Sequence, residues 1–94
     1  MHLYRSTDRE RFILSTRRVC DHITEQYLNT ILEGHRITQE DRKYLHTYYR
    51  SILLGWTLDW LEDDMKNDIR KQSRRISQLK QGHMEEIIRR CEIN

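Results

Sequence analysis

The sequence predicts an all-α protein: a three-helix antiparallel bundle that pairs with a second copy through its last two helices. The chain has no proline and only three glycines, so few residues interrupt a helix. Its apolar residues recur every three or four positions over long stretches, which is the period of an amphipathic helix. With 94 residues it is expected to form one small domain, residues 1–94, whose limited core favours association with a partner.

The first predicted helix covers about residues 7–33. Its apolar positions follow a spacing close to a heptad and are Phe12, Val19, Ile23, Tyr27 and Ile31. Cys20 and Leu28 widen this stripe. Gly34 ends the helix, because glycine readily adopts the left-handed conformation found after helix ends. The following loop is short, so the next helix should return antiparallel to the first.

The second predicted helix covers residues 38–63. Thr38 caps its start, and Asp41 lies in the first turn, where the helix dipole favours an acid. One broad apolar stripe, most of which we expect to be buried, contains Leu45, Tyr48, Tyr49, Ile52, Leu53, Trp56 and Trp60. A narrower strip on roughly the opposite side contains Thr47, Ser51, Leu54, Gly55, Leu58 and Leu61. Such a helix needs partners on two sides.

The third predicted helix covers residues 68–81, with an extension to residue 91. Asn67 or Asp68 opens it, and Ile69, Ile76 and Leu79 form its apolar side. Gly82 costs about 1 kcal/mol inside a helix, so the helix should bend or end there, before a last short piece.

Charge and cysteine content limit the possible functions. The net charge of +2 is too small to indicate a nucleic-acid or membrane surface over the whole chain. Cys20 and Cys91 are far apart and do not resemble a secreted disulfide framework, which favours a reduced, cytoplasmic protein. No stretch is long and apolar enough to span a membrane.

Candidate catalytic chemistry is sparse. Cys20, Asp21 and His22 are adjacent and point in different directions on a helix, so they do not form a metal or nucleophile site. The acidic residues 62–64 lack the alternating ligands and the glycine of a calcium loop. We therefore expect no enzymatic activity, no metal and no cofactor.

Aromatic residues provide the candidate binding site. Tyr27, Tyr48 and Trp56 lie on the faces through which the first two helices should meet. They could line a pocket for a hydrophobic or amphipathic small molecule, although aromatic residues at helical spacing are more often ordinary core.

Residues 48–65, YYRSILLGWTLDWLEDDM, and the helix after them resemble the penultimate and last helices of TetR/AcrR-family transcriptional regulators. The resemblance rests on the glycine step at Gly55, on Trp60, on the acidic residues 62–64 and on Met65 before the last helix. No compact helix-turn-helix pattern precedes these helices, so the chain looks like the C-terminal effector-binding and dimerisation domain alone.

The resemblance implies a homodimer in which the last two helices of each chain form a four-helix bundle. DNA would then be reached only through an N-terminal domain that this chain lacks. Small residues spaced by four also favour close approach of a second helix. The dimer-interface candidates are Thr47, Ser51, Gly55, Leu58, Ile69, Ile76 and Leu79. The alternative interpretation is a stand-alone helical protein–protein interaction module.

Overall fold

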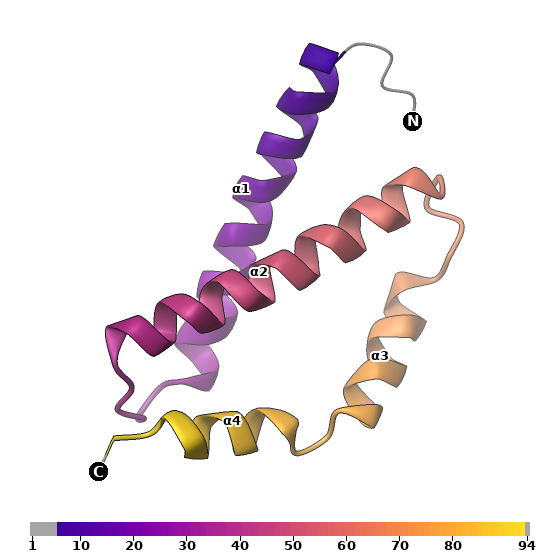
Figure 1. Ribbon diagram of the computed structural model, residues 1–94. Helices are drawn as coiled ribbons and strands as arrows, with labels where there is room; N and C mark the ends of the chain where they lie inside the picture. Colours follow the sequence, from indigo (N-terminus) through magenta and orange to yellow (C-terminus); the bar gives the residue numbers. More distant parts are fainter. Residues whose placement is uncertain (1–5, 94) are drawn as a thin grey trace.

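The protein is all-α, as the sequence predicts. The structure is a computed structural model that describes residues 6–93, with the side chains of residues 8–93. The described part contains four helices and no strand: α1 (Ser6–Ile31), α2 (Gln39–Glu62), α3 (Ile69–Leu79) and α4 (His83–Cys91) (Figure 1). The predicted third helix is thus two separate helices, α3 and α4. None of the helices described is long and apolar enough to cross a membrane.

Local sequence signals set the helix ends. The Thr38 hydroxyl accepts a hydrogen bond from the Asp41 N–H at 3.1 Å and caps α2. The Asp68 carboxylate accepts from the Arg70 and Lys71 N–H groups and caps α3 in the same way. A left-handed glycine follows α1 and another precedes α4, with φ values of 82° at Gly34 and 85° at Gly82. Gly82 therefore separates α3 from α4.

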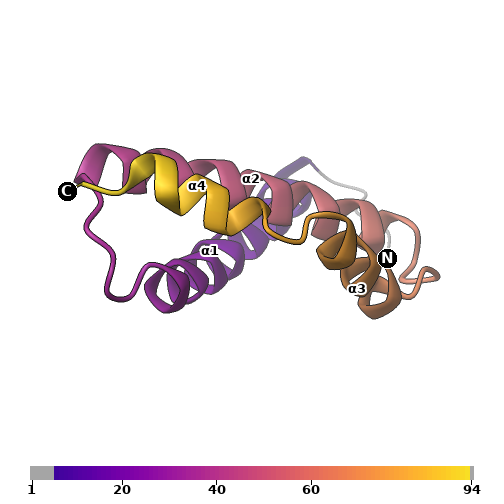
Figure 2. The ribbon, with the colours of Figure 1, turned by 90° about the horizontal axis from the view of Figure 1, so that it is seen from below.

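The four helices lie in chain order in an open arrangement (Figure 1). α2 runs back across α1, and these two form the main helix pair (Figures 1 and 2). α3 leaves the far end of α2, and α4 returns to the connection between α1 and α2. There the Ile93 N–H donates to the Arg36 carbonyl at 2.7 Å, and His35 pairs with Glu92. These contacts attach the end of the described chain to the α1–α2 loop.

The core is small and lies along the edge of the predicted α1 stripe, the edge that Cys20 and Leu28 were predicted to add, and not along its predicted centre. The buried residues of the described chain are Cys20, Thr24, Leu28, Leu32 and Ile88. In contrast, the predicted positions Val19, Ile23 and Tyr27 are 58%, 48% and 44% exposed. The helix is rotated by about one residue relative to the prediction, so that a row containing the small side chains of a cysteine and a threonine is the buried one.

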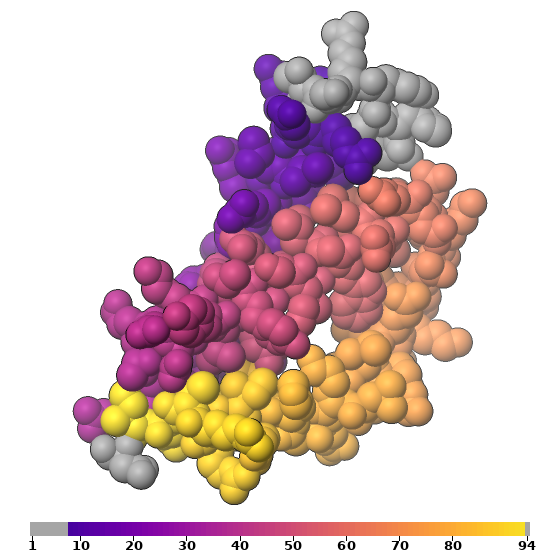
Figure 3. Space-filling view, viewed as in Figure 1, coloured from indigo at the N-terminus to yellow at the C-terminus, as the bar shows by residue number. Residues whose placement is uncertain are grey.

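The molecule is flat and leaves α2 largely uncovered. Its dimensions are 52 × 28 × 15 Å, and its radius of gyration is 15.7 Å. A compact chain of this length would have a radius of gyration of about 12 Å. No residue of α2 is buried, so the expectation that most of its broad apolar stripe is buried is wrong for the single chain. Figure 3 shows α2 crossing the front of the molecule without another helix over it.

Candidate functional site

A groove of about 530 Å³, which we call the central groove, is lined by residues of all four helices. Its apolar wall consists of Ile23, Tyr27, Ile52, Leu53, Trp56 and Ile76. Its polar side includes Ser73, Ser77, Lys80, Gln81, His83 and Glu85. A concave, mostly apolar site of this size with a few polar groups is typical of small-molecule binding.

The structure brings two of the three predicted pocket residues together. Tyr27 and Trp56 both line the central groove. Tyr48 does not line it and is 55% exposed, whereas the adjacent Tyr49 lines it. The Tyr49 ring makes edge contacts with Tyr27 and Tyr48, with centroid separations of 6.1 and 5.2 Å. Successive helical residues differ in direction by about 100°, so only one of two adjacent tyrosines can face the groove.

A second cavity of about 650 Å³ lies next to the central groove, between α2 and α3. Ile52, Trp56 and Ile76 line both cavities. The Trp56 indole N–H donates to the Gln72 side-chain carbonyl at 3.2 Å and links the two helices. Every residue of α3 after Ile69 is exposed. The helix is therefore held by few side chains, with open space beside them.

The predicted interface residues lie in two different environments. Thr47, Ser51 and Gly55 are exposed on α2, and a Cβ atom built on Gly55 would meet nothing within 4 Å. The Ser51 hydroxyl donates back to the Thr47 carbonyl at 2.7 Å, so this hydroxyl is already bonded within α2.

Of the remaining interface candidates, Leu58 lies on α2 and the other three lie on α3. Leu58 and Ile69 are half-buried, and Leu79 is 64% exposed. Ile76 is 43% exposed and lines both cavities, so it lies towards α2 and the groove. Leu79 thus remains the most exposed apolar side chain of α3.

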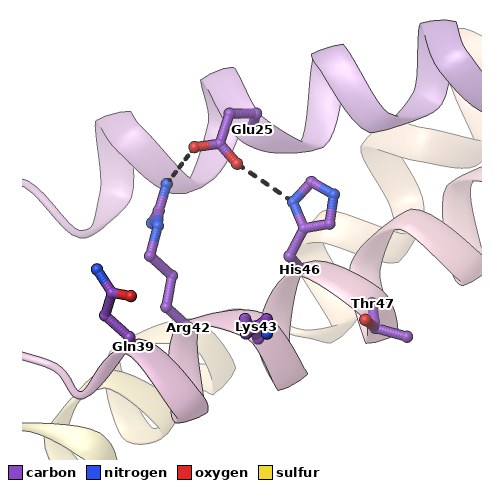
Figure 4. A pocket seen from close by; sticks show the side chains of 6 residues that line it. All are labelled: Glu25, Gln39, Arg42, Lys43, His46 and Thr47. Carbon is purple, nitrogen blue, oxygen red and sulfur yellow. Dashed lines mark hydrogen bonds and ion pairs between the residues drawn. The ribbon is translucent and has the colours of Figure 1, made fainter.

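A row of polar residues connects α1 to α2, and we call it the polar zipper. Asp21, Glu25 and Asn29 recur every four residues on α1, and Arg42, His46 and Arg50 recur every four residues on α2. Figure 4 shows Glu25 between Arg42, at 2.7 Å, and His46, at 3.3 Å. Asp21 pairs with the other His46 nitrogen at 3.1 Å and with Arg50 at 3.4 Å. This order of contacts fixes the antiparallel register of the two helices.

The polar zipper changes the acidity of one carboxyl. Desolvation would raise the pKa of Asp21, but the hydrogen bond from His46 and the nearby charges of Arg50, His46 and Arg17 outweigh it. The pKa of Asp21 is therefore lowered from its ordinary value. The polar zipper joins α1 and α2 at the surface, and its charged groups are paired with one another. We therefore assign it a structural role.

Cys20 is a core residue. It is 2% exposed, and burial is the main cause that raises its pKa, although a hydrogen bond with Thr57 acts in the opposite direction. A raised pKa keeps the thiol protonated and poorly nucleophilic. Within the described residues, no group of three or more His, Cys, Asp or Glu side chains is placed to hold a metal ion.

Sequence reasoning missed several residues of the groove and of the zipper. Lys80 and Met84 line the groove but were not candidates, and Tyr49 of the aromatic stripe lines it in place of Tyr48. Lys80 and Met84 flank the break at Gly82, and their position depends on how the chain turns there. The zipper did have a signal, because acidic and basic residues with the same spacing occupy two consecutive helices joined by a short loop.

A family model described as a transcriptional regulator C-terminal region, of the TetR type, matches residues 1–82. No curated protein and no solved structure gives a match. The family is one of regulators and not of enzymes. The match includes α1, α2 and α3, together with the glycine, tryptophan and acidic positions of residues 48–65. The chain therefore belongs to the family of TetR-type transcriptional regulator C-terminal regions.

Proposed function

We propose that this chain is the effector-binding and dimerisation region of a TetR-like regulator. The observation that best supports this proposal is the exposure of α2. No residue of this helix is buried, although the helix carries apolar residues on two sides. One side lines the central groove through Ile52 and Trp56. The other side carries the exposed row of Thr47, Ser51 and Gly55. The two sides fit two different occupants: a small molecule and a second chain.

The central groove is the proposed effector site. Its volume of about 530 Å³ lies within the range of small-molecule pockets, about 300–1,000 Å³. Tyr27 and Trp56 supply flat apolar surface. The effector is thus a hydrophobic or amphipathic small molecule.

The uncovered face of α2 is the proposed centre of a homodimer, together with exposed apolar side chains of α3. Glycine and small hydroxyl residues permit close approach of a helix from the partner. Leu79, which is 64% exposed, would be covered by the same association.

α3 couples the two sites in this proposal. Its Ser73, Ile76 and Ser77 line the groove, while Leu79 is available to a partner chain. Because α3 is held by few side chains, a ligand in the groove would shift it and so change the geometry of the dimer. Such a shift requires that the ligand binds one arrangement of α3 more tightly than another. DNA would be contacted only by a separate reader domain.

Binding of N-phenyl-1-naphthylamine, a neutral apolar probe that fluoresces in apolar sites, tests the proposed effector site. We expect the unmutated chain to bind the probe and Ser77→Phe, which fills the groove, to weaken binding at least about tenfold. Gln78→Phe is the matched control, because Gln78 is the next residue of α3 and lines neither cavity. Absence of binding to the unmutated chain, or equal weakening by both variants, would refute the proposed site.

A further inference from the structure

The central groove is lined by the ammonium group of Lys80, which has no ion-pair partner among the described residues. The Lys80 Nζ atom lies 5.7 Å from the centroid of the Tyr49 ring. Lys80 ends α3, where its N–H donates to the Ile76 carbonyl, and Gly82 then turns the chain into α4. Within residues 8–93, no carboxylate lies within ion-pair distance of Lys80. Among the described residues the contact given for the ammonium is the face of the Tyr49 ring, and the ammonium stays available to a ligand.

The hydroxyl of Tyr49, whose ring this ammonium faces, has only a weak acceptor. It donates to the Met84 sulfur at 3.3 Å, and a thioether sulfur accepts hydrogen bonds only weakly. Burial, and then the neighbouring Tyr27 and Tyr48, raise the pKa of Tyr49, so its hydroxyl remains a donor at neutral pH. A charged oxygen would be a much better acceptor for it, because hydrogen bonds to charged groups are the stronger ones.

The other charged side chains near the groove are distributed unevenly among the helices that line it. Glu85 also lines it, in the first turn of α4, where the helix dipole stabilises its negative charge. The adjoining cavity adds Lys71 and Arg75 against Asp59. α3 itself contains no acidic residue, so the α3 side of both cavities presents only positive side-chain charge.

We propose that the central groove selects an apolar molecule carrying a single carboxylate, with the carboxylate beside the Lys80 ammonium and the Tyr49 hydroxyl. The apolar body would lie on the wall formed by Tyr27, Ile52 and Trp56. This inference rests on the proposed effector function and adds the chemical class of the effector. It excludes cationic apolar compounds, which the ammonium would repel.

Three probes with the same ring system test the charge preference: 1-naphthaleneacetate, its neutral amide and 1-naphthylethylamine. Isothermal titration with the full chain should show that the acid binds roughly tenfold more tightly than the amide, with the amine weakest. The preference should decrease at high salt, because Lys80 is exposed.

Variants identify the groups responsible. Lys80→Gln should remove most of the preference for the acid over the amide, and Tyr49→Phe should reduce this preference in part. Lys66→Gln is the control, because it removes one positive charge from the α2–α3 connection and lines neither cavity. Equal affinity for acid and amide, or a preference that survives Lys80→Gln, overturns the carboxylate inference and leaves the effector site standing. If none of the three probes binds, both proposals are refuted.

Discussion

Replacing Leu28 with alanine should destabilise the fold more than any change on the exposed sides of α1. Leu28 has no exposed surface and packs in the core cluster with Leu32 of the α1 end and Ile88 of α4. Its removal therefore weakens the contact between α1 and α4 as well as the core itself. These contacts hold α4 against the C-terminal end of α1.

The expected cost follows from the burial. Leucine-to-alanine changes at fully buried sites cost about 2.7–5.0 kcal/mol, and the lower values occur where the surroundings can relax into the space. Most neighbours of Leu28 in its cluster are only partly buried, so we expect a cost of about 3 kcal/mol. A 94-residue domain has roughly 5–14 kcal/mol of total stability, so this change would remove a large share of it.

Urea unfolding followed by far-UV circular dichroism measures the effect, at one fixed protein concentration because association would add to stability. Leu14→Ala is the matched control: the same chemical change on the same helix at a side chain that is 53% exposed. It should cost less than about 1 kcal/mol. If Leu28→Ala costs no more than Leu14→Ala, the packing of α1 described above is incorrect.

Two further predictions concern acid stability and DNA. Because the pKa of Asp21 is lowered in the folded state, its stabilising contribution is present above the ordinary value of 3.8 and is lost as the pH falls below it. The stability difference between the unmutated chain and Asp21→Asn should therefore shrink on acidification, and a difference that stays constant from neutral pH to below pH 3.8 would contradict this. With a net charge of +2, the chain should also show no sequence-specific binding to duplex DNA at physiological salt, and a competitor-resistant gel shift on a defined operator would disprove that expectation.

Much of the secondary structure could be predicted because its signals are local. The Thr38 and Asp68 caps and the glycines Gly34 and Gly82 act within a few residues of themselves. Consequently the bounds of α1 and α2 lie within about two residues of the predicted ranges. The break at Gly82 occurs at the residue where the sequence indicates a bend or an end.

The orientation of α1 could not be predicted from periodicity. Val19 and Cys20, or Ile23 and Thr24, are neighbours that differ by about 100° around the helix, and hydrophobicity favours the first member of each pair. The structure buries Cys20 and Thr24, the smaller members of these pairs, along the row that continues to Leu28. Which row is buried depends on the facing helix and on the polar zipper, which are tertiary features.

The groove was predictable only in part for a similar reason. Aromatic content indicated a pocket near Tyr27 and Trp56, and both line it. Choosing correctly between Tyr48 and Tyr49 requires the direction of α2 relative to α1 and α4. Lys80 could be placed only once the direction of the chain after α3 was known.

Light scattering of the chain at micromolar concentration, with and without Gly55→Leu, tests the proposed pairing across α2 most directly. We expect the unmutated chain to have twice the mass of one 11.7 kDa chain. A Cβ atom at position 55 would meet nothing within 4 Å in its own chain, so a leucine fits there in the monomer. It would separate two closely packed helices at a cost of about 1–3 kcal/mol, so the variant should shift towards monomer. Gln26→Leu, which adds the same side chain to an exposed site on α1, should keep the mass of the dimer. A monomer mass for the unmutated chain, or a Gly55→Leu variant that dimerises as before and is more stable because leucine favours the helix, would contradict the proposed interface.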